Sequence, residues 1–165
     1  MKNTNNLIEI DLLPKVDLSN KKVLLYGIGN PLRGDDRLGL LLAELIASFS
    51  QIRNINLASL TVEMNYQLNV EDAALISDFD VVIVTDASKA DIDDFLLEKV
   101  RSDPVGFSMH AFTPGMLLQL CNETFNQSPE MYQLHIKGYK WNYSEKVSRK
   151  GKKNLEAAFL FLEEI

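Results

Sequence analysis

The sequence predicts an α/β fold: a three-layer αβα sandwich whose mostly parallel, possibly mixed, sheet has about five strands. Three observations predict it. Val23–Gly27 is an apolar run that enters a glycine-rich turn, apolar side chains at helical spacing follow the turn, and a second apolar run, Phe79–Thr85, ends at the acidic Asp86. Buried parallel strands are typically continuous apolar runs, and strands that alternate with helices form parallel sheets.

The first strand and helix frame an acidic pair. Asp35 is expected as the N-cap of the helix and Asp36 in its first turn, because Asp accepts hydrogen bonds from free helix amides and suits the positive end of the helix dipole. Asp36 should then be free to point into the crevice at the carboxyl ends of the strands. Alternation predicts a further strand at Ile55–Val62, and a short helix is expected at Val70–Ile76.

The second half of the chain continues the alternation. Strands are expected at Phe95–Val100 and Met131–Gly138. A helix is predicted at Thr113–Asn122, where Pro114 occupies the permitted first position. The last helix should run over Ser144–Ile165, although Gly151 weakens it by about 1 kcal/mol relative to Ala.

Length and composition favour one core. The chain has 165 residues, 46% of them hydrophobic, so we expect an N-terminal extension at 1–20 and a single α/β domain at 21–165. Cys121 is the only cysteine, which excludes an internal disulfide and multi-thiolate metal sites and predicts a small buried side chain. The sequence has neither an apolar run of about 20 residues nor a signal peptide, so we expect a cytoplasmic protein with no membrane partner.

The charge is unevenly distributed. The net charge is −6, which disfavours nucleic acid as a partner. Residues 137–153 contain seven Lys or Arg and one acid, Glu145, which leaves −12 on the remainder. Two interpretations stay open: a solvated loop and helix start, or a docking surface for an acidic partner, to which Tyr139, Trp141 and Tyr143 would contribute.

Two aspartates and one histidine are the candidate site residues. Asp36 follows the first strand and Asp86 follows the strongest strand, and ligands of open α/β sheets bind at the carboxyl ends of strands. His110 lies in a loop that enters a helix, where functional residues concentrate. His135 lies within an alternating strand and is expected to be structural. Two carboxylates and an imidazole would suit nickel or zinc without selecting between them.

The glycine-rich turn also allows a nucleotide-binding hypothesis. The third glycine of a G-x-G-x-x-G motif would fall at Leu32, Pro31 lacks an amide, and the acidic pair would repel phosphate at the helix start. The sequence contains no G-x-S-x-G, H-E-x-x-H or P-loop motif. This hypothesis is therefore the weaker one.

Three motifs follow one another along the chain. Residues 27–39 read GIGNPLRGDDRLG, 82–87 read VIVTDA, and Ser108-Met109-His110 is followed by Leu117-Leu118. Taken in this order, they resemble the motifs of the nickel-iron hydrogenase maturation endopeptidases, whose fold is phosphorylase/hydrolase-like. The resemblance implies that Asp36, Asp86 and His110 are both the metal-contacting and the catalytic residues. The chain departs from the family at Asp36, where Glu is frequent, and at 63–68, where many members have Asp-Gly-Gly-Thr.

The resemblance implies an endopeptidase that removes the C-terminal peptide of a nickel-loaded hydrogenase large-subunit precursor. The nickel would be supplied by the substrate and serve as the recognition element, so the free enzyme should hold no tightly bound metal. The precursor is the expected partner. Three alternatives are a non-enzymatic nickel-checking maturation factor, a nucleotide-binding α/β module and a zinc peptidase with its own metal.

Overall fold

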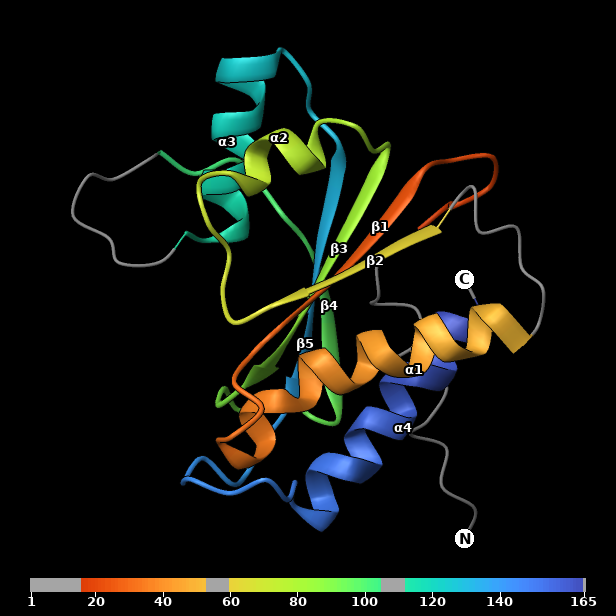
Figure 1. The fold of residues 1–165 in the computed structure, drawn as a ribbon, viewed down its shortest axis with the longest axis vertical. Helices are drawn as coiled ribbons and strands as arrows, with labels where there is room; N and C mark the ends of the chain where they lie inside the picture. Colours follow the sequence, from red (N-terminus) through yellow and green to blue (C-terminus); the bar gives the residue numbers. More distant parts are fainter. Residues whose placement is uncertain (1–15, 53–59, 105–111, 165) are drawn as a thin grey trace, which may run out of the picture.

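The computed structural model describes residues 16–52, 60–104 and 112–164. Its five-stranded sheet has the order β2-β1-β3-β5-β4 (Figure 1). The strands are β1 (Val23–Ile28), β2 (Leu60–Asn65), β3 (Val81–Ser88), β4 (Phe95–Lys99) and β5 (Glu130–Lys137). All neighbours pair in parallel except β4 and β5, which are antiparallel. The mostly parallel, mixed sheet of five strands is thus confirmed.

Helices cover both faces of the sheet. They are the 3-10 helix η2 (Gly34–Arg37) and the α-helices α1 (Leu38–Ile52), α2 (Asp72–Ile76), α3 (Pro114–Phe125) and α4 (Arg149–Glu164). Figure 1 shows α1 and α4 on one face and α2 and α3 on the other. Each face has its own apolar core, one containing Leu42, Ile83 and Leu155, the other Val82, Leu117 and Met131. The three-layer αβα sandwich is confirmed.

Two predicted strands have different ends. The strand expected at Ile55–Val62 lies partly outside the described residues, and β2 continues to Asn65 because it pairs with β1 up to Ile28. The strand expected to stop before Asp86 instead runs to Ser88. Its last three residues pair with 135–137 of β5. The strand itself was predicted at Met131–Gly138, but its pairing with residues beyond Thr85 was not.

The last helix begins later than predicted. α4 starts at Arg149 and not at Ser144. The Ser148 hydroxyl accepts a hydrogen bond of 2.9 Å from the Gly151 amide, which is the geometry of an N-cap. Ser144 lies in the preceding loop, where its backbone pairs with that of Arg33.

Only residues 16–20 of the predicted N-terminal extension are described. Among them, Val16 and Leu18 pack against the α1 and α4 core, and residues 1–15 lie outside the described residues. Cys121 is fully buried, as predicted. In the part of the chain that the structure describes, no helix combines the length and apolar character needed to cross a bilayer.

Candidate active site

Asp36 and Asp86 line one cavity of about 310 Å³ where β1 and β3 end. Asp36 lies in η2, directly after the turn that leaves β1, and Asp86 lies near the carboxyl end of β3. The other lining residues come from the ends of β1 and β2, from β5 and from the start of α3: Ile28, Gly29, Tyr66, Gln67, Leu68, Phe112, Thr113, Pro114 and Gln133. Two of the three predicted site residues therefore share one cavity.

Glycines in the turn region allow this close approach. Gly29 has a φ of +144°, which side chains rarely adopt, and a Cβ there would overlap the Asp36 carbonyl oxygen. In α1, a Cβ on Gly39 would lie 2.9 Å from the Asp86 Cα and would overlap the Thr85 carbonyl oxygen. Gly29 and Gly39 thus allow η2 and α1 to pack directly against the carboxyl ends of β1 and β3.

The two cavity carboxylates, Asp36 and Asp86, have no ion-pair partner in the part of the chain that the structure describes. Burial raises the pKa of Asp86 to about 7, against the lowering effect of a 2.7 Å hydrogen bond from the Ala87 amide, and the charge of Asp36 raises it further. Two close acids that lack a counterion are suited to bind a cation.

Asp35 points away from this cavity. It is fully buried, and its carboxylate accepts hydrogen bonds from the amides of Tyr139, Lys140 and Ser148 and from the Ser148 hydroxyl, at 2.5–3.0 Å. Burial alone would raise the pKa of Asp35, but the hydrogen bonds from Ser148, Tyr139 and Lys140 lower it below its ordinary value.

The predicted helix-capping role of Asp35 is therefore wrong. Residues 34–37 form a 3-10 helix whose N-cap is Arg33, and the Asp35 carboxylate binds the loop after β5 instead. Adjacent residues of a tight helix point in different directions, so Asp35 faces this loop while Asp36 faces the cavity. A structural role for Asp35 was expected, but its partners lie over a hundred residues away.

His110, the third predicted site residue, lies outside the described residues. Phe112, Thr113 and Pro114, which follow it closely in the sequence, line the cavity with the two aspartates. The Thr113 hydroxyl accepts a 3.2 Å hydrogen bond from the Met116 amide and so caps α3. In residues 16–52, 60–104 and 112–164, no three His, Cys, Asp or Glu side chains gather into a metal site. The participation of His110 remains a prediction.

His135 has the hydrogen-bonded role expected of it. It is the register partner of Asp86, but its Nε2 atom lies 2.9 Å from a Glu98 carboxylate oxygen, and it does not line the cavity. Gln133, two residues earlier on the same face of β5, does line it. Sequence reasoning missed Gln133, Tyr66 and Gln67. Tyr66 and Gln67 follow the carboxyl end of β2, so the strand-end rule could have indicated them.

The glycine-rich turn does not offer free amides to a phosphate. The Gly29 amide donates to the Asn65 carbonyl (3.2 Å), the Gly34 amide to Ser144 (2.7 Å) and the Asp35 amide to Lys140 (2.7 Å). Phosphate cradles need such amides unpaired and directed at the ligand. The geometry therefore argues against the nucleotide-binding hypothesis.

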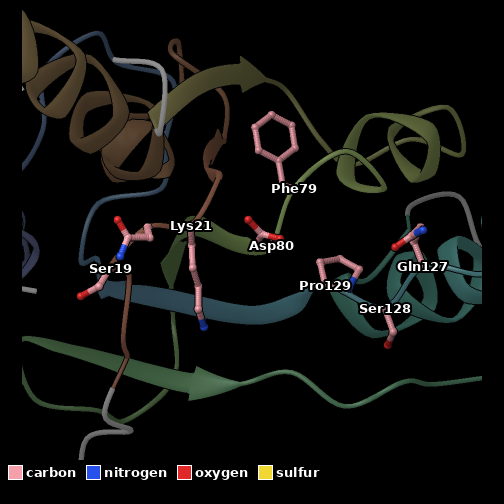
Figure 2. A pocket seen from close by; sticks show the side chains of 8 residues that line it. Ser19, Lys21, Phe79, Asp80, Gln127, Ser128 and Pro129 are labelled. Atoms are coloured by element: carbon pink, nitrogen blue, oxygen red, sulfur yellow. The ribbon is translucent and has the colours of Figure 1, made fainter. Parts of the chain in front are cut away.

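A second cavity, of about 520 Å³, lies at the opposite end of the sheet (Figure 2). Its charged residues, Lys21 and Asp80, already have partners within the protein. The Lys21 Nζ lies 3.4 Å from Glu130, and Asp80 accepts a 2.7 Å hydrogen bond from the Lys22 amide. This cavity lies at the amino ends of the strands, whereas ligands of open α/β sheets usually bind at the carboxyl ends. We do not assign a function to it.

Comparisons with known proteins agree with this architecture. No protein-family model and no curated protein sequence matches the chain. Solved structures do. The [NiFe] hydrogenase maturation protease HycI from Thermococcus kodakarensis KOD1 aligns with a TM-score of 0.68 and 19% identity, over 89% of this chain and 94% of its own. The hydrogenase maturating endopeptidase HybD from E. coli aligns with a TM-score of 0.64 and 13% identity, over 86% and 89%.

A hydrogenase 2 maturation peptidase from a Thaumarchaeota archaeon is also similar, with a TM-score of 0.61, 18% identity and coverage of 87% of this chain and 97% of its own. These alignments span nearly the whole of each neighbour. At such low identity they establish the architecture. The chain has the fold of the hydrogenase maturation proteases.

Proposed function

We propose that this chain is a hydrogenase maturation endopeptidase, which removes the C-terminal peptide of a nickel-loaded hydrogenase large-subunit precursor. One observation carries the proposal: Asp36 and Asp86, which come from separate elements, line a single cavity without a neutralising cation among the described residues. The shared fold and the ordered motifs add to it. The cytoplasm is the compartment that we infer for this reaction.

In this proposal the metal belongs to the substrate. Asp36 and Asp86 offer carboxylate oxygens, and His110 would add an imidazole nitrogen, to coordination positions that the precursor leaves open on its nickel. Such contacts hold the scissile peptide bond at the cavity, which supplies proximity and orientation. Only a precursor that carries its metal would be held in this way, so metal loading would be checked before cleavage.

Hydrolysis then needs an activated water. A carboxylate of the cavity serves as general base if it accepts the proton of that water, and the substrate's nickel can polarise the peptide carbonyl. In the free protein, burial raises the pKa of Asp86 to about 7, so a carboxylate of this cavity that is not bound to nickel suits a general base near neutral pH. A protease of this kind needs no serine or cysteine nucleophile.

The test is a cleavage assay with purified chain and nickel-loaded precursor, read out by mass spectrometry of the precursor. The wild-type chain should shorten it. Asp36→Ala, Asp86→Ala and His110→Ala should each reduce the rate at least 100-fold while circular dichroism stays native. Asp93→Ala removes an exposed acid and serves as the matched control, with an unchanged rate.

Two results would contradict the proposal. If the Asp36→Ala chain processes precursor at the wild-type rate, Asp36 takes no part in the cleavage. A wild-type chain that binds the nickel-loaded precursor but never shortens it would instead identify a non-enzymatic nickel-checking factor.

A further inference from the structure

The loop after β5 and the first turn of α4 expose an unusual combination of side chains. We define the basic aromatic surface as Tyr139, Lys140, Trp141, Tyr143, Lys146, Arg149 and Lys150, with Lys89 from the end of β3. Tyr139 is 45% and Tyr143 78% exposed. Lys146, Arg149 and Lys150 are exposed as well. Aromatic and Arg residues on one surface are typical of protein interfaces.

Within 16–52, 60–104 and 112–164, the cations of the basic aromatic surface form no ion pairs. The ion pairs formed among the described residues involve Lys21, Lys99, Lys137 and His135, none of which belongs to this surface. Two of its lysines instead lie over aromatic rings, Lys89 at 4.8 Å from the Trp141 ring centroid and Lys150 at 5.3 Å from that of Tyr139. Their charge remains available to a ligand.

The surface adjoins the candidate active site. The Gly34 amide donates to the Ser144 carbonyl, the Asp35 amide to the Lys140 carbonyl, and an Arg37 Nη1 to the Glu145 carbonyl, at 2.7–3.0 Å. Figure 1 shows the loop after β5, in blue, beside the orange start of α1. A ligand on the basic aromatic surface would therefore lie next to the turn that carries Asp36.

The loop is also held in a fixed conformation. The Asp35 carboxylate accepts hydrogen bonds from Tyr139, Lys140 and Ser148, which anchors both ends of the loop. A surface that is already ordered loses little conformational entropy on binding. This distinguishes it from a solvated basic loop, whose backbone would not be tied to a buried carboxylate.

The uneven distribution of charge over the chain indicates which class of partner the basic aromatic surface binds. Apart from Lys89, the basic aromatic surface lies in the segment 137–153, and the chain outside that segment carries −12. An acidic ligand would be repelled from most of the molecule and attracted here, which steers it towards the cavity. We propose that an acidic segment of the protein substrate docks on the basic aromatic surface. This proposal rests on the proposed endopeptidase function.

The chain provides its own probe for a test, because Trp141 is its only tryptophan. A synthetic peptide of alternating Glu and Gly, titrated into the full chain, should change the Trp141 fluorescence saturably and bind less tightly as salt is added. The same peptide with Gln in place of Glu should have no effect. Absence of any saturable change with the Glu peptide would overturn the proposal.

A charge-reversed variant localises the binding. Lys146→Glu/Lys150→Glu should weaken peptide binding at least 10-fold. The fold should tolerate it because both positions are exposed and position 150 lies in the first turn of α4, where Glu is favourable. The control Lys22→Glu/Arg101→Glu makes the same change in net charge at exposed positions elsewhere and should bind as the wild type does. Equal weakening in both variants would overturn the proposal.

Precursor cleavage separates this proposal from the proposed function. The Lys146→Glu/Lys150→Glu variant should raise KM for nickel-loaded precursor about 10-fold and leave kcat unchanged, whereas the control variant should change neither. Cleavage with an unchanged KM would overturn the docking surface and leave the endopeptidase standing. Peptide binding without any precursor cleavage would overturn the endopeptidase and leave the binding site for an acidic ligand standing.

Discussion

The carboxylate of Asp35 accepts two hydrogen bonds from Ser148, one from its amide at 2.5 Å and one from its hydroxyl at 2.6 Å, across 113 positions of the sequence. These bonds join the turn after β1 to the start of α4. The same Ser148 hydroxyl also caps α4. Asp35 therefore fixes the relative position of the candidate site and the basic aromatic surface.

Replacing Asp35 should destabilise the protein strongly. Asp35→Asn would place an amide group among four hydrogen-bond donors, and we expect a loss of about 3 kcal/mol or more in the free energy of unfolding, because hydrogen bonds to buried charges contribute more than neutral ones. Urea denaturation measures it. The exposed Asp93→Asn should change stability by less than about 0.5 kcal/mol.

The Asp35 contribution should also depend on pH. Its folded-state pKa lies below the ordinary value of 3.8, so its stabilisation is fully present above that value and is lost as the pH falls through the folded-state pKa. The wild type should thus lose more stability than Asp35→Asn as the solution is acidified in this range. Parallel losses in the two proteins would contradict the assigned role.

Asp86 should behave in the opposite way. Its folded-state pKa of about 7 exceeds the ordinary 3.8. The free protein should therefore lose stability as the pH rises from about 4 to 7, because in this range the Asp86 carboxyl ionises in the unfolded state but stays protonated in the folded state. Asp86→Asn should therefore be more stable than the wild type, by at most on the order of 4 kcal/mol above pH 7 and by much less near pH 4. Denaturation at pH 5 and pH 8 tests this, and an advantage that is larger at pH 5 would be the wrong sign.

Gly39→Ala should destabilise the protein although Ala usually favours a helix over Gly. The added Cβ would overlap the Thr85 carbonyl and lie 2.9 Å from the Asp86 Cα, so α1 would have to move away from the strand ends. We expect a loss of about 2 kcal/mol or more, as for other overpacked positions. Ser48→Ala, at an exposed position of the same helix, is the control and should be nearly neutral. A Gly39→Ala protein as stable as this control would show that the helix can shift freely.

The free chain should contain no stoichiometric metal. In the proposed function the nickel arrives with the precursor, and Asp36 and Asp86 alone provide too few ligands for a closed site. Elemental analysis of purified protein measures this directly. One equivalent of zinc that survives a chelator would favour a zinc peptidase with its own metal.

The sequence predicted the features that depend on local patterns and on one general rule of α/β sheets. The apolar runs at 23–27 and 79–85 were recognisable as buried strands, although β3 begins only at Val81. Asp36 and Asp86 could be expected near one another because both follow strands at the same edge of the sheet. The structure places them in one cavity.

The features that sequence reasoning missed depend on contacts between distant segments. Nothing near Asp35 indicates that Tyr139, Lys140 and Ser148 would surround it. The extension of β3 to Ser88 requires β5 beside it. The start of α4 could have been predicted from the sequence, because Ser148 is a residue type that caps helices. Ser144, another serine, offered a competing start.

The opposite orientations of Asp35 and Asp36 constrain the turn after β1 in length more than in composition. Leu32 and Arg33 are exposed, and only their backbone groups are paired with neighbouring segments, so many side chains can occupy both positions. Deleting either residue would bring Asp36 to the place of Asp35 and Arg37 to the place of Asp36, so the cavity would lose one of its two carboxylates. In a library in which this turn is randomised, the variants that fold should differ in the residues at positions 32 and 33 but keep the same turn length.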